Sequence, residues 1–199
     1  MIANPYQPLN ATIIEVIDES PTIKSFVIEP EQPFKFDTGQ FIELTLPGRG
    51  EAPFTPSSSP SLTERMEVTI MKAGCVTGLL HECDPGQKVG IRGPLGHGYP
   101  VDTFVGKQVY IIGGGVGLAP IRSLLLTLID RIGDFRRVVC RFGARTPEEF
   151  IYKSALFGPW QKISGLDIAC TVDKANGQWS GPVGVVTEIV KPDDVDVNE

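Results

Sequence analysis

The feature that most constrains the fold is an apolar run that leads directly into a glycine cluster and then into a helical pattern. The run KQVYIIGG at 107–114 is apolar without alternation, which is typical of a strand covered on both faces of a parallel sheet. The segment APIRSLLLTLIDRI at 119–132 repeats apolar residues at helical spacing. Two more strand-like and helix-like pairs follow: RRVVCRFGAR with EEFIYKSALFGPW, and LDIACTVD with GVVTEIVK. This alternation predicts parallel βαβ units.

The first half of the chain shows the two-residue alternation of short β-strands. Short alternating or β-branched runs are separated by prolines and glycines: ATIIEVIDES, TIKSFVIEP, GQFIELTLPG, MEVTIMK and KVGIRGP. Such spacing predicts a small antiparallel β-barrel. The segment VTGLLHEC at 76–83 has helical spacing and predicts one short helix between two strands. We therefore expect two domains, a barrel at 1–103 and an α/β parallel-sheet domain at 104–199.

Composition excludes several classes of function. The 199 residues carry a net charge of −6 with a pI near 5.0, which disfavours binding to nucleic acid or to an anionic membrane. No apolar run approaches the roughly 20 residues of a membrane span, and the start MIANPYQPLN lacks the pattern of a signal peptide. The four cysteines are widely spaced, so the sequence suggests no zinc site and no disulfide framework. We expect a cytoplasmic protein.

The strongest local signal is the glycine cluster of YIIGGGVGLAP. Glycines between a strand and a helix allow close backbone approach at the helix N-terminus, where free N–H groups favour a phosphate. A tight turn without a ligand is the alternative, but the position between strand and helix favours phosphate binding. The spacing is not G-x-G-x-x-G, and no acid stands clearly about 20 residues further on. Arg145 and Thr146 follow the next strand instead.

Two further segments each favour a purely structural role when they are considered alone. In MKAGCVTGLLHEC, Thr77 is either a helix cap or part of a second anion site, and the segment alone favours the cap. In PFTPSSSP at 53–60, a loop carries one aromatic and several hydroxyl residues, and Phe54 alone would be interpreted as a core residue.

Taken in chain order, these segments resemble the ferredoxin–NADP reductase-like flavoprotein family. The matching stretches are PFTPSSS, MKAGCVTGLLHECDPGQKVGIRGPLGHGYP, GGGVGLAPIRSLL, FGARTPEEFIYK and CTVD, and they cover nearly the whole chain. Within the family, PGRGEAPFTPSSSP and the early NPY are most similar to the diaphorase-type gamma subunits of nickel–iron sulfhydrogenases. The corresponding subunit of anaerobic sulfite reductase and the electron-transfer subunit of dihydroorotate dehydrogenase are further relatives. The resemblance implies an FAD-binding domain at 1–103 and a truncated NAD(P)-binding domain at 104–199.

The resemblance also implies a role for individual residues. Phe54 would lie against the isoalloxazine ring, and Thr55 would act at the reacting centre by hydrogen bonding near flavin N5. The usual arginine of the flavin motif is replaced by Ala52, which places more of the pyrophosphate binding on the turn at 74–77. FAD is favoured and FMN less so. The full set of implied flavin contacts is Phe54, Thr55, Ser57, Ile70, Lys72, Gly74, Val76 and Thr77.

In the second domain, the resemblance places the pyrophosphate of a nicotinamide dinucleotide on the glycine loop. The implied contacts are Gly113, Gly114, Gly115, Gly117, Ala119 and Pro120, with Arg145 and Thr146 beside the adenosine ribose. Arg145 would favour a 2′-phosphate, whereas Glu148 and Glu149 would repel one. The choice between NAD and NADP stays open on the sequence.

The implied function is that of a flavin-dependent electron-transfer subunit. It would pass a hydride between NAD(P)H and FAD and single electrons to an iron–sulfur or metal-containing partner subunit. A flavin-holding scaffold, a flavin-free nucleotide sensor and a dihydroorotate dehydrogenase-type electron-transfer subunit are the alternatives. The four cysteines do not have the spacing of 2Fe–2S ligands, so we expect such a cluster in a missing C-terminus or in a partner. The strand at 107–114 would also have one bare side, which a further segment or a partner chain would cover.

Overall fold

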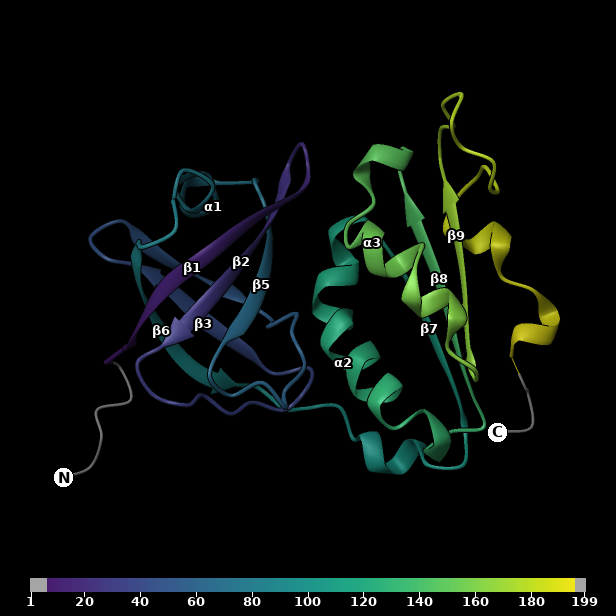
Figure 1. The fold of residues 1–199 in the computed structure, drawn as a ribbon, viewed down its shortest axis with the longest axis horizontal. Helices are drawn as coiled ribbons and strands as arrows, with labels where there is room; N and C mark the ends of the chain where they lie inside the picture. Colours follow the sequence, from purple (N-terminus) through teal and green to yellow (C-terminus); the bar gives the residue numbers. More distant parts are fainter. Residues whose placement is uncertain (1–6, 196–199) are drawn as a thin grey trace. The chain divides into compact units, whose positions relative to one another are not determined.

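The computed structural model describes residues 7–195, so the NPY stretch and the last four residues of the acidic tail lie outside it. The chain divides into two compact units, each described by itself below (Figure 1). The first unit contains Thr22–Tyr99, the residues up to Asp18, and Ala119–Leu126. The second contains Pro100–Leu118, the residues from Thr127 onwards, and the short segment Glu19–Pro21.

The first unit is built on a six-stranded antiparallel sheet. Its strands are β1 (Leu9–Ser20), β2 (Ile23–Pro30), β3 (Phe41–Leu46), β4 (Gly50–Phe54), β5 (Met66–Met71) and β6 (Lys88–Leu95), in the order β4-β3-β6-β1-β2-β5. The helix α1 (Cys75–Leu80) lies between β5 and β6 in the chain. The predicted antiparallel domain is confirmed. Within residues 7–195, no hydrogen-bonded ladder joins the two outer strands β4 and β5.

Alternation along the strands builds the core of this unit. In β3, Ile42, Leu44 and Leu46 are buried and their neighbours are partly exposed, as the sequence pattern predicts. The core also receives Phe26 and Ile28 from β2, both fully buried. Burying each such side chain contributes about 1.5–3 kcal/mol, which is the main reason why the register of these strands is fixed.

The second unit is built on a three-stranded parallel sheet. Its strands are β7 (Gln108–Gly114), β8 (Arg137–Ala144) and β9 (Leu166–Val172), in the order β7-β8-β9. Figure 1 shows α3 (Lys153–Leu156) on one face of this sheet and the yellow segment at 186–194 on the other. The longest described helix is α2 (Leu118–Asp130), and no helix in the described part of the chain is long and apolar enough to cross a membrane. The predicted parallel sheet is confirmed.

Two segments with helical patterns form only short helical turns. The pattern at 148–160 is divided among η4 (Pro147–Glu149), α3 and η5 (Pro159–Lys162). Tyr152 adopts a left-handed conformation with φ 54° before α3, and Pro159 has no N–H to continue it. The pattern at 184–191 yields the single turn η6 (Val186–Ile189). The remaining short turns are η1 (Val101–Phe104), η2 (Gly115–Gly117), η3 (Ile132–Asp134) and η7 (Pro192–Asp194).

Close packing and a buried ion pair hold the segment at 186–194 on the sheet. A side chain at Gly143 would place its Cβ 3.0 Å from the Cβ of Val186, so Val186 would have to shift by a few tenths of an ångström to admit it. Arg141 donates two hydrogen bonds to the carboxylate of Asp194, at 2.9 and 2.6 Å, and one to Asp167 Oδ1 at 3.1 Å. The sequence analysis did not anticipate this cluster.

The charges of this cluster are mutually stabilised. The hydrogen bonds from Arg141 hold the pKa values of Asp194 and Asp167 below their ordinary range. Burial works against the charge of Arg141, but the two carboxylates outweigh it and raise the pKa of the guanidinium. All three groups are therefore ionised at neutral pH, although Arg141 and Asp194 are each only 3% exposed.

Candidate flavin and nucleotide sites

The glycine loop connects β7 to α2 and leaves open space beside its backbone. A Cβ added at Gly115 or Gly117 would meet no atom within 4 Å, whereas one at Gly114 would lie 3.2 Å from the carbonyl oxygen of Gly143. Gly115 has φ 55°, a conformation that favours glycine. The first N–H groups of α2 have no acceptor within the helix. Open backbone at the start of a 13-residue helix fits a pyrophosphate group.

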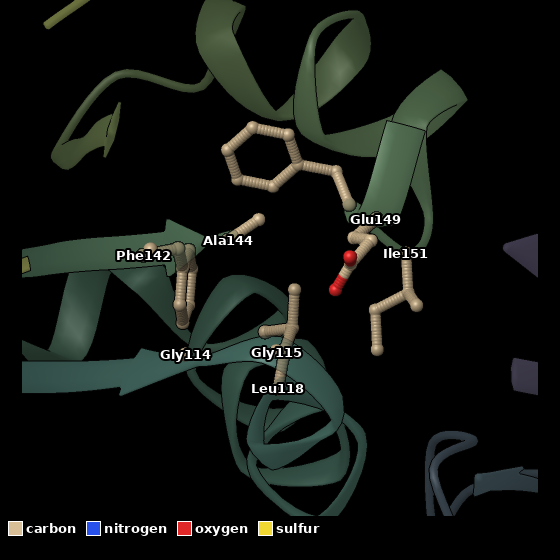
Figure 2. A pocket seen from close by; sticks show the side chains of 9 residues that line it. Gly114, Gly115, Leu118, Phe142, Ala144, Glu149 and Ile151 are labelled. Carbon is tan, nitrogen blue, oxygen red and sulfur yellow. The ribbon is translucent and has the colours of Figure 1, made fainter. Parts of the chain in front are cut away.

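A small open hollow, with room for about one water molecule, lies beside this loop. It is lined by Gly114, Gly115, Leu118, Phe142, Gly143, Ala144, Glu149, Phe150 and Ile151. Figure 2 shows the side chains of Leu118, Glu149 and Ile151 extending into it, with the carboxylate oxygens of Glu149 at its edge. Two of the predicted glycines therefore line the same hollow, together with an acidic residue that the sequence analysis had associated only with repulsion.

The two residues predicted beside the ribose do not line this hollow. Arg145 is exposed, and its carbonyl oxygen accepts a hydrogen bond from the N–H of Lys174 at 2.9 Å. Thr146 is the N-terminal cap residue of η4. Its side chain forms a hydrogen bond with the carboxyl of Glu148, and this bond makes the largest contribution to the lowered pKa of that carboxyl. Of the remaining loop residues, Ala119 is buried and Pro120 is exposed in the first turn of α2.

An aromatic cluster supports the wall of the hollow. Phe150 is buried, and its ring centroid lies 5.2 Å from that of Phe157 and 5.5 Å from that of Trp179. The Trp179 ring donates a hydrogen bond to the carbonyl oxygen of Pro182 at 2.9 Å. These contacts fix the loop that follows β9 against the residues around Glu149, since aromatic pairs at such distances attract one another.

In the predicted flavin loop, two hydroxyl groups have different surroundings. The Thr55 hydroxyl forms no hydrogen bond with any residue of the described part of the chain, and the residue is half-buried. The Ser57 hydroxyl is fully buried and donates to the carbonyl oxygen of Glu67 at 3.1 Å. Phe54 ends β4 and packs, partly buried, against the core. Thr55 is therefore available to a ligand, whereas the Ser57 hydroxyl is used inside the protein.

The turn before α1 is organised by Thr77. Its hydroxyl oxygen accepts hydrogen bonds from the N–H groups of Ala73 and Gly74, at 2.9 and 2.8 Å. This is the capping role that the sequence also allowed. Gly74 itself has open space around its Cα. The side chain of Lys72 runs along α1, because its Cε lies 3.9 Å from the Cβ position of Gly78.

Two further predicted contacts face the core. Ile70 is 1% exposed on β5, and its carbonyl oxygen lies 2.9 Å from Nε2 of His81. Val76 packs against the core from α1. Their side chains shape the turn and leave only their backbone to a ligand.

The cysteines do not form a metal site among the described residues, where no group of three potential ligands occurs. Cys75 is exposed and the other three are buried and unpaired. Burial raises the pKa of Cys140 and of Cys170 to about 12. These two thiols are therefore protonated at neutral pH, and a thiol rather than a thiolate is a poor metal ligand.

Comparisons with known proteins assign both parts of the chain to known domain families. The oxidoreductase FAD-binding domain family matches residues 10–99, and the oxidoreductase NAD-binding domain family matches residues 111–198. The gamma subunit of sulfhydrogenase 2 from Pyrococcus furiosus is 34% identical over 158 residues, which are 77% of this chain and 54% of that protein. A probable electron-transfer subunit of dihydroorotate dehydrogenase B from Methanocaldococcus jannaschii is 32% identical over 195 residues, 96% of this chain and 67% of that protein.

Solved structures share the fold and are longer than this chain. A ferredoxin–NADP⁺ reductase from Neisseria gonorrhoeae with bound FAD and NADP has a TM-score of 0.75 at 20% identity, with 88% of this chain and 72% of that chain covered. A cytochrome P450 reductase from Amycolatopsis has a TM-score of 0.80 at 24% identity, with coverage of 92% and 56%. The chain spans about half of the length of the sulfhydrogenase gamma subunit and about two thirds of that of the dihydroorotate dehydrogenase subunit. With both halves matched in order, the chain belongs to the ferredoxin–NADP reductase-like family of FAD- and NAD(P)-binding oxidoreductases.

Proposed function

We propose that the chain is the flavin-dependent electron-transfer part of a cytoplasmic multi-subunit complex. It passes a hydride between NAD(P)H and FAD and single electrons to an iron–sulfur or metal-containing partner subunit. The names of the similar proteins support this proposal, because sulfhydrogenase gamma and the dihydroorotate dehydrogenase protein are both subunits. The unpaired cysteines are consistent with a reducing compartment.

The first unit supplies a fitting environment for FAD. When bound, FAD would accept the hydride and release electrons one at a time to a carrier. Phe54 offers an aromatic surface beside the unused hydroxyl of Thr55, which we propose as the residue acting at the reacting centre. The open backbone at Gly74 and the ammonium group of Lys72 would hold the phosphates in place of the arginine that Ala52 replaces. Ser57, Ile70, Val76 and Thr77 shape this surface from behind.

The second unit supplies the nucleotide site. Backbone N–H groups at Gly113–Gly117 and the start of α2, with Ala119 and Pro120, would hold the dinucleotide pyrophosphate. Arg145 and Thr146 would flank the adenosine ribose at the end of β8. No side chain acts as a base in this proposal, because the residues bind and orient groups and exclude water from them.

The observation that carries the nucleotide proposal is the open space at Gly117. Gly117 has φ −61°, which every residue adopts easily, and an added methyl group would meet nothing. Gly117→Ala should therefore fold normally, and its methyl group should collide only with a bound pyrophosphate. We expect at least a tenfold weaker NADH affinity (about 1.4 kcal/mol) with unchanged flavin content.

Gly133→Ala is the matched control, since its Cβ position is equally open and lies in η3. Titration of NADH against the yellow, flavin-loaded protein measures both variants, and bleaching of the flavin absorbance reports reduction. Unaltered NADH affinity in Gly117→Ala would remove the loop from the site. A colourless protein that gains no absorbance with added FAD would instead favour a scaffold without flavin or, if NADH still binds, the flavin-free nucleotide sensor.

A dihydroorotate dehydrogenase-type complex is the second candidate for the partner. It is favoured by the similarity over 96% of this chain and 67% of the Methanocaldococcus jannaschii protein, against 77% and 54% for the sulfhydrogenase protein. Co-purification from the native source decides between the candidates, because a dihydroorotate-oxidising partner and a hydrogen-oxidising partner have different activities. A fully active monomer with no partner would instead indicate a free-standing reductase.

A further inference from the structure

We propose that Arg122 is a positioning residue for the flavin loop, which we define as residues 54–58. Its guanidinium holds the backbone carbonyl of Ser57 and thereby sets the orientation of the Thr55 hydroxyl, which we assign to the reacting centre. This inference rests on the proposed function and adds a residue of α2 that stands 65 residues from Ser57 along the chain. Arg122 and the flavin loop belong to the same compact unit.

The first support is the pair of hydrogen bonds that the Arg122 guanidinium donates. Its Nη1 donates to the carbonyl oxygen of Ser57 at 3.2 Å and to Oε1 of Glu67 at 2.5 Å. The side chains of Arg122 and Glu67 are only 18% and 17% exposed, so water screens this ion pair less than one at the surface. Hydrogen bonds from an ionised donor are also about twice as strong as neutral ones. Arg122 therefore fastens the backbone of the flavin loop to a side chain of β5.

The second support is the set of hydrogen bonds that joins the loop to β5 and β2. The N–H of Ser57 donates to the carbonyl oxygen of Glu67 at 2.7 Å, and the N–H of Glu67 donates to the Ser58 hydroxyl at 3.0 Å. The Ser57 hydroxyl lies 3.2 Å from that of Thr69, which lies 2.7 Å from that of Ser25. These four hydroxyl residues are all buried. The N–H and the side chain of Ser57 are thus held by β5, and its carbonyl oxygen is left for Arg122.

The third support is the stiffness of the chain between Ser57 and Thr55. Pro56 stands between them, and its ring fixes φ at about −65°. A residue that precedes proline is restricted to extended backbone conformations, which limits Thr55 in turn. A displacement of the Ser57 peptide is therefore passed on to Thr55. The Thr55 hydroxyl is half-buried and forms no hydrogen bond within the described part of the chain, so its direction depends on this backbone.

The test measures reduction of the flavin by NADH in the flavin-loaded full chain, by stopped-flow absorbance at saturating NADH. Arg122→Leu should slow reduction about tenfold to a hundredfold, since a misplacement of about 1 Å at a reacting group can cost that much. The dissociation constant of NADH should stay unchanged, and Arg122→Lys should recover part of the rate. Arg131→Leu is the control with an unchanged rate, because the guanidinium of Arg131 pairs with the exposed carboxylates of Asp102 and Asp134.

Two double variants separate positioning from a purely structural role. If Arg122 acts through Thr55, the Arg122→Leu, Thr55→Val variant should be no slower than the slower single variant. The Arg122→Leu, Glu67→Leu variant should be more stable than Arg122→Leu in urea, because no unpaired charge stays partly buried. It should nevertheless reduce its flavin as slowly as Arg122→Leu, since the Ser57 carbonyl still lacks its donor. This variant also keeps the test valid where Arg122→Leu alone fails to fold.

Visible circular dichroism of the bound flavin gives a reading that does not depend on turnover. Arg122→Leu and Thr55→Val should change this spectrum in the same way, because both remove the same hydroxyl from its position beside the ring. The FAD content of the protein is measured alongside and should stay close to that of the wild type.

The outcomes separate this inference from the proposed function. A wild-type rate and spectrum in Arg122→Leu would overturn the positioning role. Multiplied rate losses in the Arg122→Leu, Thr55→Val variant would also overturn it, as would recovery of the rate in the Arg122→Leu, Glu67→Leu variant. A slow Arg122→Leu beside an unaffected Thr55→Val would overturn the path through Thr55. Failure of the wild type to bind FAD would overturn the proposed function itself, and this inference with it.

Discussion

Replacing Arg141 with alanine should destabilise the second unit by about 3 kcal/mol. Breaking a buried ion pair by removing one partner costs about 3–5 kcal/mol, since an uncompensated charge stays buried. Two features place the expected cost for Arg141→Ala at the lower end of this range. Arg137 Nη2 lies 4.0 Å from Asp194 Oδ1, and the N–H of Lys191 still donates to Oδ2 at 3.0 Å. Undocking of the segment at 186–194 would also return the carboxylate to water, which limits the cost.

The assay is urea unfolding followed by tryptophan fluorescence. Both tryptophans, Trp160 and Trp179, belong to the second unit, so the signal reports that unit even if the first unfolds separately. Arg137→Ala is the control. Its side chain is 40% exposed and pairs with Asp167, which is 38% exposed, and such a pair is worth no more than about 1 kcal/mol.

A double variant tests the reasoning further. Arg141→Met combined with Asp194→Leu removes both charges, so it should cost less than Arg141→Ala alone. Hydrogen exchange of the amides at 186–194 should accelerate in Arg141→Ala and approach the wild-type rate in the double variant. The reasoning is refuted if Arg141→Ala costs no more than Arg137→Ala, or if the double variant is the least stable of the three.

Three further predictions concern acid stability and the flavin loop. Because Arg141 lowers the pKa of Asp194 and of Asp167, their stabilisation is complete above about pH 4, the pKa of an unfolded Asp, and is lost as the pH falls through the lower folded values. Unfolding curves between pH 2 and 5 should therefore show a steeper loss for the wild type than for the Arg141→Met, Asp194→Leu variant. Thr55→Val should slow flavin reduction by NADH, measured by stopped-flow absorbance, without loss of stability. Ser57→Ala should lower the free energy of unfolding by about 1 kcal/mol, measured by thermal unfolding, because the Ser57 hydroxyl forms a hydrogen bond inside the protein. Equal effects of the two variants in both assays would contradict this division of roles. Phe54→Ala should weaken flavin retention in dialysis, whereas Phe41→Ala on the neighbouring strand should not, although both lose partly buried aromatic area.

Periodicity made most of the fold predictable, because local patterns coincide with the packing. The alternation in β3 and the apolar run of β7 gave the right type of strand, and the order of segments gave the right sheet. β4 escaped prediction because GEAPF has no alternation and contains a proline. The helix expected at 148–160 is interrupted because Tyr152 adopts a left-handed conformation there, which no local pattern signals.

Long-range partners explain what the sequence could not show. Arg141 stands between apolar residues in β8, and its partners lie 26 and 53 residues away along the chain. Only the fold brings them together, so spacing offers no signal beyond a charged residue at a position where a strand is expected to be buried. The hydroxyl residues around the flavin loop pose the same problem, since Thr55 and Ser57 look equivalent in PFTPSSS and differ only in their partners.

The two candidate phosphate sites share one physical strategy. The flavin motif has Ala52 in place of a cation, and the described lining of the nucleotide hollow contains no basic side chain. Both sites would therefore bind phosphates largely through backbone N–H groups and open glycines, which carry partial charges fixed in direction, with Lys72 as the proposed cation of the flavin site. Such binding selects the shape of a pyrophosphate more than its total charge.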